Sequence, residues 1–379
     1  MAHTTESTRP LRVGAIGAGA IARLSHLPAI SSIPGLEVAA IADPSVERAQ
    51  DLASQYGATG YVGYKEMFDN ENLDVALVAI PNHLHRQAIE EAAVRGIHVM
   101  CEKPLAHNLV DAQAALEACD KAGVQMQVGF NQRFWEPTQI SKRALDAGVI
   151  GDVQAFRSVY SEAWNVYPAA TNYRYDLQQS GGASIIDLGV HRIDLARYLI
   201  GDIVEVCATM DHRVIPHAAD DNVFLLVRFA SGATGVINSD RFSPQVSATT
   251  DLYGPNGTIH ISTETSNPFA SVPLAISSTL PKDALPEEIS QADWPTAWWN
   301  AYEPGTWLEF RPPRTNPYVS EWVAFEESIR SGIPSDVVPT GIDGVRAQEI
   351  VTAAYRSVRT HGWIGLPLND PEEPIPSYS

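Results

Sequence analysis

Hydrophobic and polar positions alternate along this chain in two different ways. Up to Phe130, short apolar runs, each long enough for one buried strand, are separated by segments with helical periodicity. Continuous apolar strands joined by helices predict a parallel sheet that is covered by helices on both faces. The runs read RVGAIG, EVAAIAD, DVALVAI, HVMCEK and VQMQVGF.

After Phe130 the pattern changes to longer strands with strict alternation, beginning beyond a predicted helix, TQISKRALDAG. The segments SGAT and PNGT predict hairpin turns, so this part is expected to form a mostly antiparallel sheet. Residues 266–317, rich in Pro and Trp, show no pattern that assigns elements, and two helices follow them. We therefore predict an α/β domain over residues 1–128 and an α+β domain over residues 129–379.

The segment SIIDLGVHRIDLARYLIG, residues 184–201, reads as a helix that is apolar around most of its circumference. At 3.6 residues per turn, its polar side chains fall within roughly 60° of arc. They are Asp187, His191, Asp194 and Tyr198. Buried carboxylates and imidazoles are costly without partners, so this stripe is expected to face a functional site.

Composition narrows the class of protein. The chain has 379 residues, 45% of them hydrophobic, which is enough for two domains with their own cores. A formal net charge of −19 argues against a nucleic-acid partner. Three cysteines without CxxC spacing indicate reduced thiols, and no apolar run is long enough to span a membrane. We expect a soluble, cytoplasmic protein with no membrane partner.

A dinucleotide motif follows the first strand. Gly17, Gly19 and Ala22 have the spacing G-x-G-x-x-G/A, which allows a tight turn and a close backbone approach to a pyrophosphate. Ala20 and Ile21 lie at the start of the helix and complete the expected contact. Asp43 ends the second strand, where a carboxylate binds the ribose hydroxyls and repels a 2′-phosphate. No Arg immediately follows it, so NAD is favoured over NADP. The alternative is a plain glycine turn with an Asp that caps the next helix.

Two later strand ends add candidates at the same sheet edge. Ile80 ends a strand and Asn82 opens a helix, where His85 is either a cofactor contact or an ordinary helix-start histidine. His83 and His85 have no third ligand nearby in the sequence, so no metal site is predicted. Another strand ends in Glu102 and Lys103, and a partly desolvated lysine beside an oxidised nicotinamide could polarise a substrate hydroxyl. Read alone, this segment is a charged turn.

These motifs together resemble one known family, the glucose–fructose oxidoreductase / inositol dehydrogenase (Gfo/Idh/MocA) family. The resemblance rests on GAIGAGAIA, IAD, IPNHLH, CEKPLA, GFNQRF and GGASIIDLGVHRIDLARYLIG, which occur in the family's order from near Leu11 to HGWIGLPL. It implies an N-terminal Rossmann domain and a C-terminal α+β domain with an open, mainly antiparallel sheet. It also implies a homodimer or homotetramer.

The resemblance also implies roles for individual residues. His191 would be the general base or acid at the reacting hydroxyl, Asp187 would orient its imidazole, and Lys103 would approach the same oxygen. Glu102 would place the nicotinamide ribose. The chemistry agrees, since a hydroxyl must lose its proton as its carbon loses hydride, and a His beside an Asp supplies such a base. The alternative is that Asp187 caps the helix after SGG and His191 fills a polar gap in the core.

Substrate contacts are expected from four residues: Asn131, Arg133, Trp164 and Tyr173. Aromatic side chains suit the apolar face of a sugar ring, whereas Arg133 could equally pair with an acidic residue. The predicted function is NAD-dependent oxidation of a secondary hydroxyl of a sugar, polyol or sugar derivative. One alternative is a redox-neutral, NAD-using enzyme that cleaves glycosides. The other is a non-catalytic sensor of NAD or a sugar.

Overall fold

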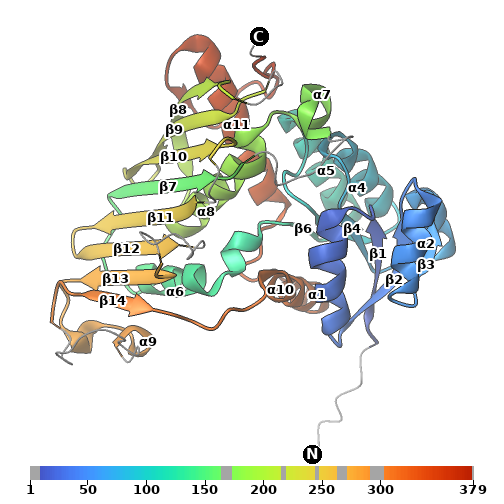
Figure 1. Cartoon of the computed structure of the whole chain (residues 1–379), viewed down its shortest axis with the longest axis horizontal. Coiled ribbons are helices and arrows are strands. Elements are labelled where there is room, and N and C mark those ends of the chain that lie inside the picture. The colour runs from blue at the N-terminus through green and yellow to red at the C-terminus, as the bar shows by residue number, and fades with distance from the viewer. Residues whose placement is uncertain are drawn as a thin grey trace, which may run out of the picture. The chain divides into compact units, whose positions relative to one another are not determined.

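The computed structural model describes residues 9–163, 173–214, 219–243, 247–262, 271–290 and 303–377. The chain divides into two compact units, shown in Figure 1. Unit 1 comprises Met1–Ala106, Val110–Asn131 and Asn316–Val345, and unit 2 comprises His107–Leu109, Gln132–Thr315 and Arg346–Ser379. Each unit has its own sheet, so the predicted fold class is confirmed.

Unit 1 is built on a six-stranded sheet in which every neighbouring pair is parallel. The strand order is β3-β2-β1-β4-β5-β6, so the chain adds strands on one side of β1 as far as β3 and on the other side from β4 onward. In sheets of this type, ligands bind at the carboxyl ends of the strands, next to this switch point. The strands are β1 (Leu11–Ile16), β2 (Leu36–Ala42), β3 (Thr59–Tyr61), β4 (Val75–Val78), β5 (His98–Cys101) and β6 (Met126–Val128).

Helices connect these strands and cover the sheet. They are η1 (Ala22–His26), α1 (Leu27–Ser32), α2 (Val46–Ser54), α3 (Tyr64–Asn70), η2 (Asn82–Leu84), α4 (His85–Ala93) and α5 (Leu109–Ala122). One core of this unit joins α1 to β1, β2 and β4, and it includes Val13, Ile30, Leu77 and Trp322. The alternation predicted from the apolar runs is therefore present, with the sheet interior formed by those runs.

The helix α10 (Pro317–Ser331) belongs to unit 1, although the sequence boundary at residue 128 assigned it to the second domain. Asn316 caps its N-terminus by accepting a hydrogen bond from the Tyr318 amide, and Gly332 ends it in the left-handed region. Its apolar residues Trp322 and Phe325 are buried in the core of unit 1. A boundary drawn along the sequence cannot anticipate such a return of the chain.

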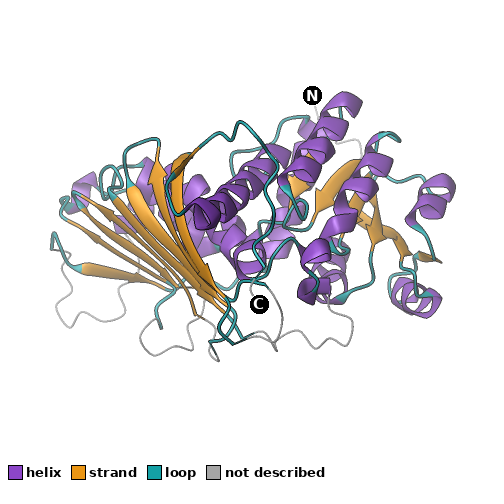
Figure 2. Cartoon of the chain, turned by 90° about the horizontal axis from the view of Figure 1, so that it is seen from above, coloured by secondary structure: helices purple, strands orange, loops and turns teal. Residues whose placement is uncertain are grey.

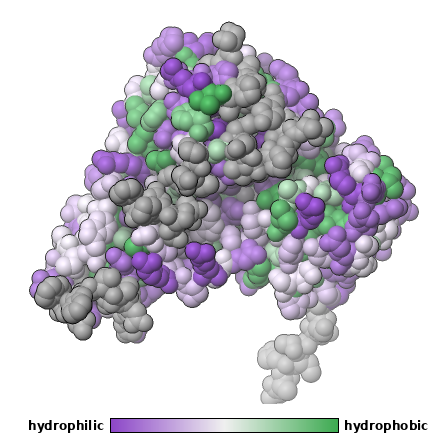
Figure 3. Space-filling view, viewed as in Figure 1, coloured by the Kyte–Doolittle hydropathy of each residue, from purple (hydrophilic) through white to green (hydrophobic). Residues whose placement is uncertain are grey.

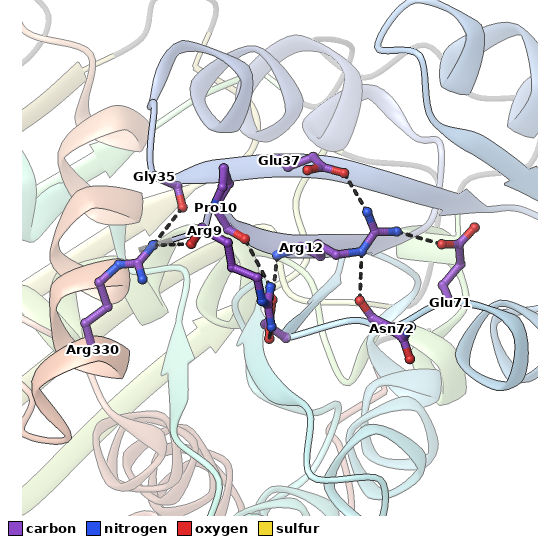
Figure 4. Close-up of polar contacts among 9 residues, drawn as sticks. Arg9, Pro10, Arg12, Gly35, Glu37, Glu71, Asn72 and Arg330 are labelled. Atoms are coloured by element: carbon purple, nitrogen blue, oxygen red, sulfur yellow. Dashed lines mark hydrogen bonds and ion pairs between the residues drawn. The ribbon is translucent and has the colours of Figure 1, made fainter. Parts of the chain in front are cut away.

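A network of ion pairs surrounds the start of β1 (Figure 4). This end of the sheet is opposite to the end that carries the glycine turn. Arg12 pairs with Glu37 and Glu71, and the Asp74 carboxylate accepts two hydrogen bonds from Arg9 and one from the Arg12 amide. Burial would raise the pKa of Asp74, but the Arg9 hydrogen bonds and charge hold it below its usual value. Arg330 of α10 donates to the main-chain carbonyls of Arg9 and Gly35, which ties this helix to the network.

Unit 2 is built on a nine-stranded, mixed sheet in the order β14-β13-β12-β11-β7-β10-β9-β8-β15. Only β7 and β10 pair in parallel; the other neighbours are antiparallel, as predicted. The segments SGAT and PNGT form the β9–β10 and β11–β12 turns. The strands are β7 (Ala155–Ser161), β8 (Ile203–Asp211), β9 (Asn222–Phe229), β10 (Thr234–Asp240), β11 (Ser247–Gly254), β12 (Gly257–Ser262), β13 (Leu274–Ser278), β14 (Trp307–Phe310) and β15 (Ile364–Gly365).

Two of these strands lie in the segment that sequence patterns left unassigned. β13 and β14 are short and extend the sheet at one edge, and β13 alternates between buried and half-buried positions. Five residues with so few apolar positions give too weak a period to recognise in a Pro-rich segment. Trp294, Trp298 and Trp299 lie outside the described residues, whereas Trp307 on β14 is exposed.

Helices pack on one side of the strongly twisted sheet of unit 2, as Figure 2 shows. η6 and α8 lie against β7 and β10, and α6 lies against β12. The helices are η3 (Asn131–Phe134), α6 (Glu136–Asp146), η5 (Tyr173–Tyr175), α7 (Leu177–Ser180), η6 (Ile185–Gly189), α8 (Val190–Ile200), η7 (Lys282–Ala284), α9 (Glu287–Ser290) and α11 (Gly341–Thr360).

The surface seen in Figure 3 is mostly polar, with hydrophobic residues in small separate groups. Among the residues that the structure describes, no helix combines the length and the apolar character needed to cross a membrane.

Candidate active site

The glycine turn lies at the carboxyl end of β1. Gly17 has φ +101°, and a Cβ atom there would lie 2.3 Å from the Ala79 carbonyl oxygen at the end of β4. Only glycine fits this position, because both the dihedral angle and the approach of β4 exclude a side chain. Gly19 faces open space, and Ala20 beside it is exposed. Ile21 is half-buried, and Ala22 is buried against the sheet, as the motif requires.

Asp43 lies beside this turn, at the end of β2. Its Oδ2 accepts the Ala18 amide at 3.0 Å, and its Oδ1 accepts the Ser45 amide at 2.9 Å. Burial would raise its pKa, but these amides and Arg48 hold it below the usual value, so the carboxylate is charged. Arg48, on the first turn of α2, donates to Oδ1 at 2.7 Å and is itself exposed. The sequence motif gives no signal for Arg48, because this residue lies five positions beyond Asp43 rather than directly after it.

The end of β4 carries the next three candidates. Ile80 is half-buried and Asn82 is buried at the start of η2. His85 is fully buried, with Nε2 2.8 Å from the Ile80 carbonyl and Nδ1 3.0 Å from the Pro104 carbonyl. Burial lowers its pKa. The described contacts of His85 thus join the loops after β4 and β5, and its role as a cofactor contact stays a prediction.

Glu102 and Lys103 follow β5. The Glu102 side chain is almost fully buried, and its Oε1 lies 2.7 Å from Nε2 of His26, a residue at the end of η1. Its Oε2 accepts the Lys103 amide at 3.1 Å. Burial would raise the pKa of Glu102, but the His26 hydrogen bond and the Lys103 charge hold it below its usual value. Lys103 is half-buried.

These features of unit 1 fit a dinucleotide. Gly19 and Ala20 are exposed residues of the turn where the helical segment begins, which suits contact with a pyrophosphate. A charged carboxylate at the end of β2 suits ribose hydroxyls, and a second one follows β5. Within the described ranges, no group of three His, Cys, Asp or Glu side chains could hold a metal ion.

In unit 2, the predicted helix of residues 184–201 begins with a π-helical turn, η6, before α8. The prediction of one continuous 3.6-residue period was therefore wrong at Asp187. A π-turn has a wider repeat, which rotates Asp187 relative to His191, and such turns often occur at functional sites. Both side chains are nonetheless nearly buried, with 7% and 8% of their residue surface exposed.

The helix start is capped by a residue from a distant loop. Asp220 accepts the amides of Ala183 at 2.9 Å and Ile185 at 2.8 Å, and its main-chain carbonyl accepts the amide of Ser184. The alternative in which Asp187 caps the helix is therefore not what these hydrogen bonds show. The turn before it is tight, because a Cβ at Gly182 would lie 2.0 Å from the Tyr355 hydroxyl.

Asp187 takes part in a buried ion-pair cluster. Its Oδ2 pairs with Arg241, which follows β10, and with Arg174 at 3.3 Å. Arg241 also pairs with Glu162 at 3.1 Å. Opposite charges within this distance hold the carboxylate ionised in a buried setting. No sequence signal pointed to these arginines, because they come from separate loops of the sheet.

His191 lies in an aromatic and cationic layer on the helix-facing side of the sheet. The Tyr160 ring on β7 lies 6.1 Å from the His191 ring, and the Arg192 guanidinium lies 4.8 Å from the Tyr160 ring. Arg192 is 1% exposed, and burial lowers its pKa to about 10. A buried guanidinium and a phenol ring therefore lie in the same layer as the His191 imidazole.

The rest of the polar stripe has structural partners. Arg133 forms a buried, two-pronged ion pair with Asp194, at 2.9 Å and 2.6 Å. Its guanidinium also stacks on Tyr198, 5.1 Å from the ring centre, and Tyr198 receives a hydrogen bond from Gln139. The described contacts of Arg133 are thus those of an internal ion pair, which was the alternative to substrate contact.

Three further substrate candidates remain. Tyr173 is half-buried, and its ring lies 4.8 Å from the Arg174 guanidinium that pairs with Asp187. Asn131 is half-buried at the start of η3. Trp164 lies outside the described residues. Tyr173 is therefore the candidate that the described contacts connect to the cluster around Asp187.

The capping carboxylate should make stability depend on pH. Burial raises the pKa of Asp220 to about 6, above that of the unfolded chain, so its contribution to the free energy of unfolding is present at low pH. This contribution is lost as pH rises through 6, by at most about 3 kcal/mol. In chemical denaturation, Asp220→Asn should therefore be clearly destabilising near pH 4 and less so near pH 7.

Asp74→Asn is the control with the opposite sign, because the pKa of Asp74 is lowered in the folded state. Its cost should grow as pH rises toward the ordinary carboxylate pKa of about 4 and should then level off. A cost of Asp220→Asn that also grows with pH would contradict the raised pKa.

Comparison with known proteins places this geometry in a family. Residues 11–130 match the Gfo/Idh/MocA oxidoreductase family, NAD-binding Rossmann fold, and residues 138–260 match the Gfo/Idh/MocA C-terminal domain. A D-apiose dehydrogenase of Paraburkholderia graminis is 30% identical over 271 residues, which cover 69% of this chain and 70% of that protein. A myo-inositol 2-dehydrogenase of Thermotoga maritima is 31% identical over 237 residues, which cover 61% of this chain and 69% of that protein.

A solved structure of levoglucosan dehydrogenase in complex with NADH and levoglucosan has the same fold, with a TM-score of 0.80. The two sequences are 24% identical, and the match covers 95% of this chain and 100% of that chain. The two family matches together span more than half of the residues, and they agree with the glycine turn, the Asp43 carboxylate and the two sheets. This chain is therefore an NAD-binding oxidoreductase that belongs to the Gfo/Idh/MocA family.

Proposed function

We propose that the chain oxidises a secondary hydroxyl of a sugar, polyol or sugar derivative, with NAD as the acceptor of the hydride. The observation that carries this proposal is the buried, charged cluster around Asp187 on the helix that also bears His191. Relatives named for D-apiose and myo-inositol support a polyhydroxylated substrate. The Tyr160 and Tyr173 rings near this helix suit the apolar face of a sugar ring.

The proton chemistry is assigned to three side chains. His191 takes the proton of the reacting hydroxyl, because an imidazole titrates near working pH. Asp187, held ionised by Arg241 and Arg174, favours the imidazolium that results. Lys103 stabilises negative charge on the same oxygen with its ammonium group.

Two substitutions test these roles. Lys103→Met and His191→Ala should each lower kcat by about 100-fold or more, because each removes a group that acts on the reacting proton. The affinity for NAD, measured by fluorescence titration, should change by less than about twofold. His191→Ala should also flatten the pH profile of kcat. A panel of sugars and polyols with NAD, followed by the absorbance of reduced nicotinamide, supplies the assay.

Matched controls come from the same units. Lys121→Met removes an exposed lysine of α5, and His260→Ala removes a histidine on β12 that bonds Asp251 at 2.6 Å. Both should leave kcat and its pH profile unchanged. An unchanged profile in His191→Ala, or a product that forms without accumulation of NADH, would overturn the proposal.

We propose that Asp43 selects NAD over NADP by its charge. Asp43→Ala should weaken NAD binding by roughly tenfold, because the ribose hydroxyls lose a charged acceptor. NADP should lose less, since the freed Arg48 can then bind a 2′-phosphate. In the double variant Asp43→Ala/Arg48→Ala, this difference between the losses of NAD and NADP affinity should disappear. Equal losses for both cofactors in the single variant would contradict the assignment.

A homodimer or homotetramer is proposed to form through the outer face of the unit 2 sheet. On β9, buried residues alternate with the exposed Phe224, Leu226 and Arg228, and Arg228 stacks on the exposed Trp363. Phe224 and Leu226 are 45% and 46% exposed, on a strand with neighbours on both sides rather than on a loop. Adjacent exposed apolar residues of this kind mark interaction surfaces.

Sedimentation analysis tests this surface. Leu226→Arg should shift the protein to a smaller species, because it buries an unpaired charge in the interface. Leu24→Arg, at an apolar residue of unit 1 that is 69% exposed, is the control and should leave the mass unchanged. A monomeric wild-type protein, or an unaltered mass for Leu226→Arg, would contradict the proposal.

The compartment is proposed to be the cytoplasm. The cysteines Cys101, Cys119 and Cys207 are all free, and the first two are buried. Free thiols support a reducing compartment.

A further inference from the structure

Three buried side chains of unit 1, far apart in the sequence, form a hydrogen-bonded chain. Trp322 on α10 donates from its indole Nε1 to Nδ1 of His26 at 3.0 Å. Nε2 of His26 lies 2.7 Å from Oε1 of Glu102, which follows β5. Trp322 and His26 have no exposed surface, and Glu102 has 8%. This series of hydrogen bonds thus runs from the core of unit 1 to the sheet edge where the cofactor residues lie.

The direction of each hydrogen bond follows from the donors. An indole N–H can only donate, so Nδ1 of His26 must be the acceptor and carries no proton. In the neutral ring the proton is then on Nε2, which donates to the Glu102 carboxylate. Trp322 therefore sets the tautomer of His26, and this tautomer is the one that bonds Glu102.

The Glu102 carboxylate is held at both oxygens. Oε1 accepts from His26, and Oε2 accepts from the amide of Lys103, the proposed catalytic lysine. Gly129 at the end of β6 leaves room for it, since a Cβ there would lie 3.2 Å from the Glu102 Cδ. Two donors of fixed position leave the carboxylate little freedom to rotate, so its remaining lone pairs point in a defined direction.

We propose that Trp322 and His26 are positioning residues for the nicotinamide half of NAD, acting through Glu102. This inference rests on the proposed function and on the contact with the nicotinamide ribose that the family resemblance implies for Glu102. His26 lies at the end of η1, the helical segment that follows the glycine turn. The chain of bonds acts as an outer shell, comparable to the groups that orient ligands around a metal.

Binding measurements separate this role from simple packing. ADP lacks the nicotinamide ribose, so it reports on the adenosine end alone, whereas NAD reports on both ends. His26→Leu should weaken NAD by roughly tenfold and ADP by less than about twofold, because Glu102 loses its charged hydrogen bond. Titration calorimetry on the full chain gives both dissociation constants without any turnover.

Conservative variants sharpen the test. His26→Gln keeps a donor for Glu102 and an acceptor for Trp322, so it should restore most of the NAD affinity. Trp322→Phe removes only the indole N–H and should reduce NAD affinity with little effect on ADP. Phe325→Leu is the packing control: Phe325 is equally buried on α10 and touches Trp322, but it has no polar atom. It should lower stability without changing the ratio of the two affinities.

The tautomer itself can be observed in the protein without cofactor. Nitrogen-15 spectra of histidine-labelled protein, with His26→Gln to assign the signal, should show the Nε2–H tautomer for His26. In Trp322→Phe this preference should weaken, because nothing then donates to Nδ1.

Parallel losses of NAD and ADP affinity in His26→Leu would overturn the proposal, as would an Nδ1–H tautomer in the wild-type protein. A Trp322→Phe variant with the same ratio of NAD to ADP affinity as Phe325→Leu would also overturn it. None of these outcomes depends on catalysis. Failure of the Lys103 and His191 variants to affect turnover would therefore count against the proposed reaction alone.

Discussion

A buried charge must be paired or hydrogen-bonded, and the buried carboxylates of the candidate site follow that constraint. In unit 1, Asp43 is held by two amides and Arg48, and Glu102 by His26 and the Lys103 amide. In unit 2, Asp187 and Asp194 each face arginines, and Asp220 accepts amides at a helix start. Removing one partner would leave an uncompensated charge, so these groups hold one another in place.

This arrangement explains how rigid elements supply chemistry to a bound cofactor and substrate. The pKa values of Asp43 and Glu102 are both held below their usual values, although burial alone would raise them. Their charges are therefore ready before a ligand binds, and the ligand does not have to organise them. Hydrogen bonds from main-chain amides and from side chains of core helices offset the free energy of desolvating these carboxylates.

Irregular helix geometry occurs at both candidate regions. A π-helical segment follows the glycine turn and ends at His26, and another carries Asp187. Each π-helical turn contains more residues than an α-helical turn, and this changes which side chains face the site. In both cases the segment then continues into a regular helix, α1 or α8, that anchors it in a core.

Local signals in the sequence were enough for much of the fold and part of the site. Apolar runs predicted the parallel sheet, strict alternation predicted the antiparallel one, and Gly17, Gly19 and Asp43 predicted NAD binding. These succeed because period and turn chemistry are properties of neighbouring residues. The tertiary structure alone decided that α10 returns to unit 1 and that β13 and β14 extend the second sheet. It also decided that His26, Arg48 and Arg241 are the partners of buried carboxylates, and that Asp220 caps the helix start before Asp187. These partners lie up to 296 residues apart, as for Trp322 and His26. No local pattern records a contact of that range, because it depends on how whole elements pack.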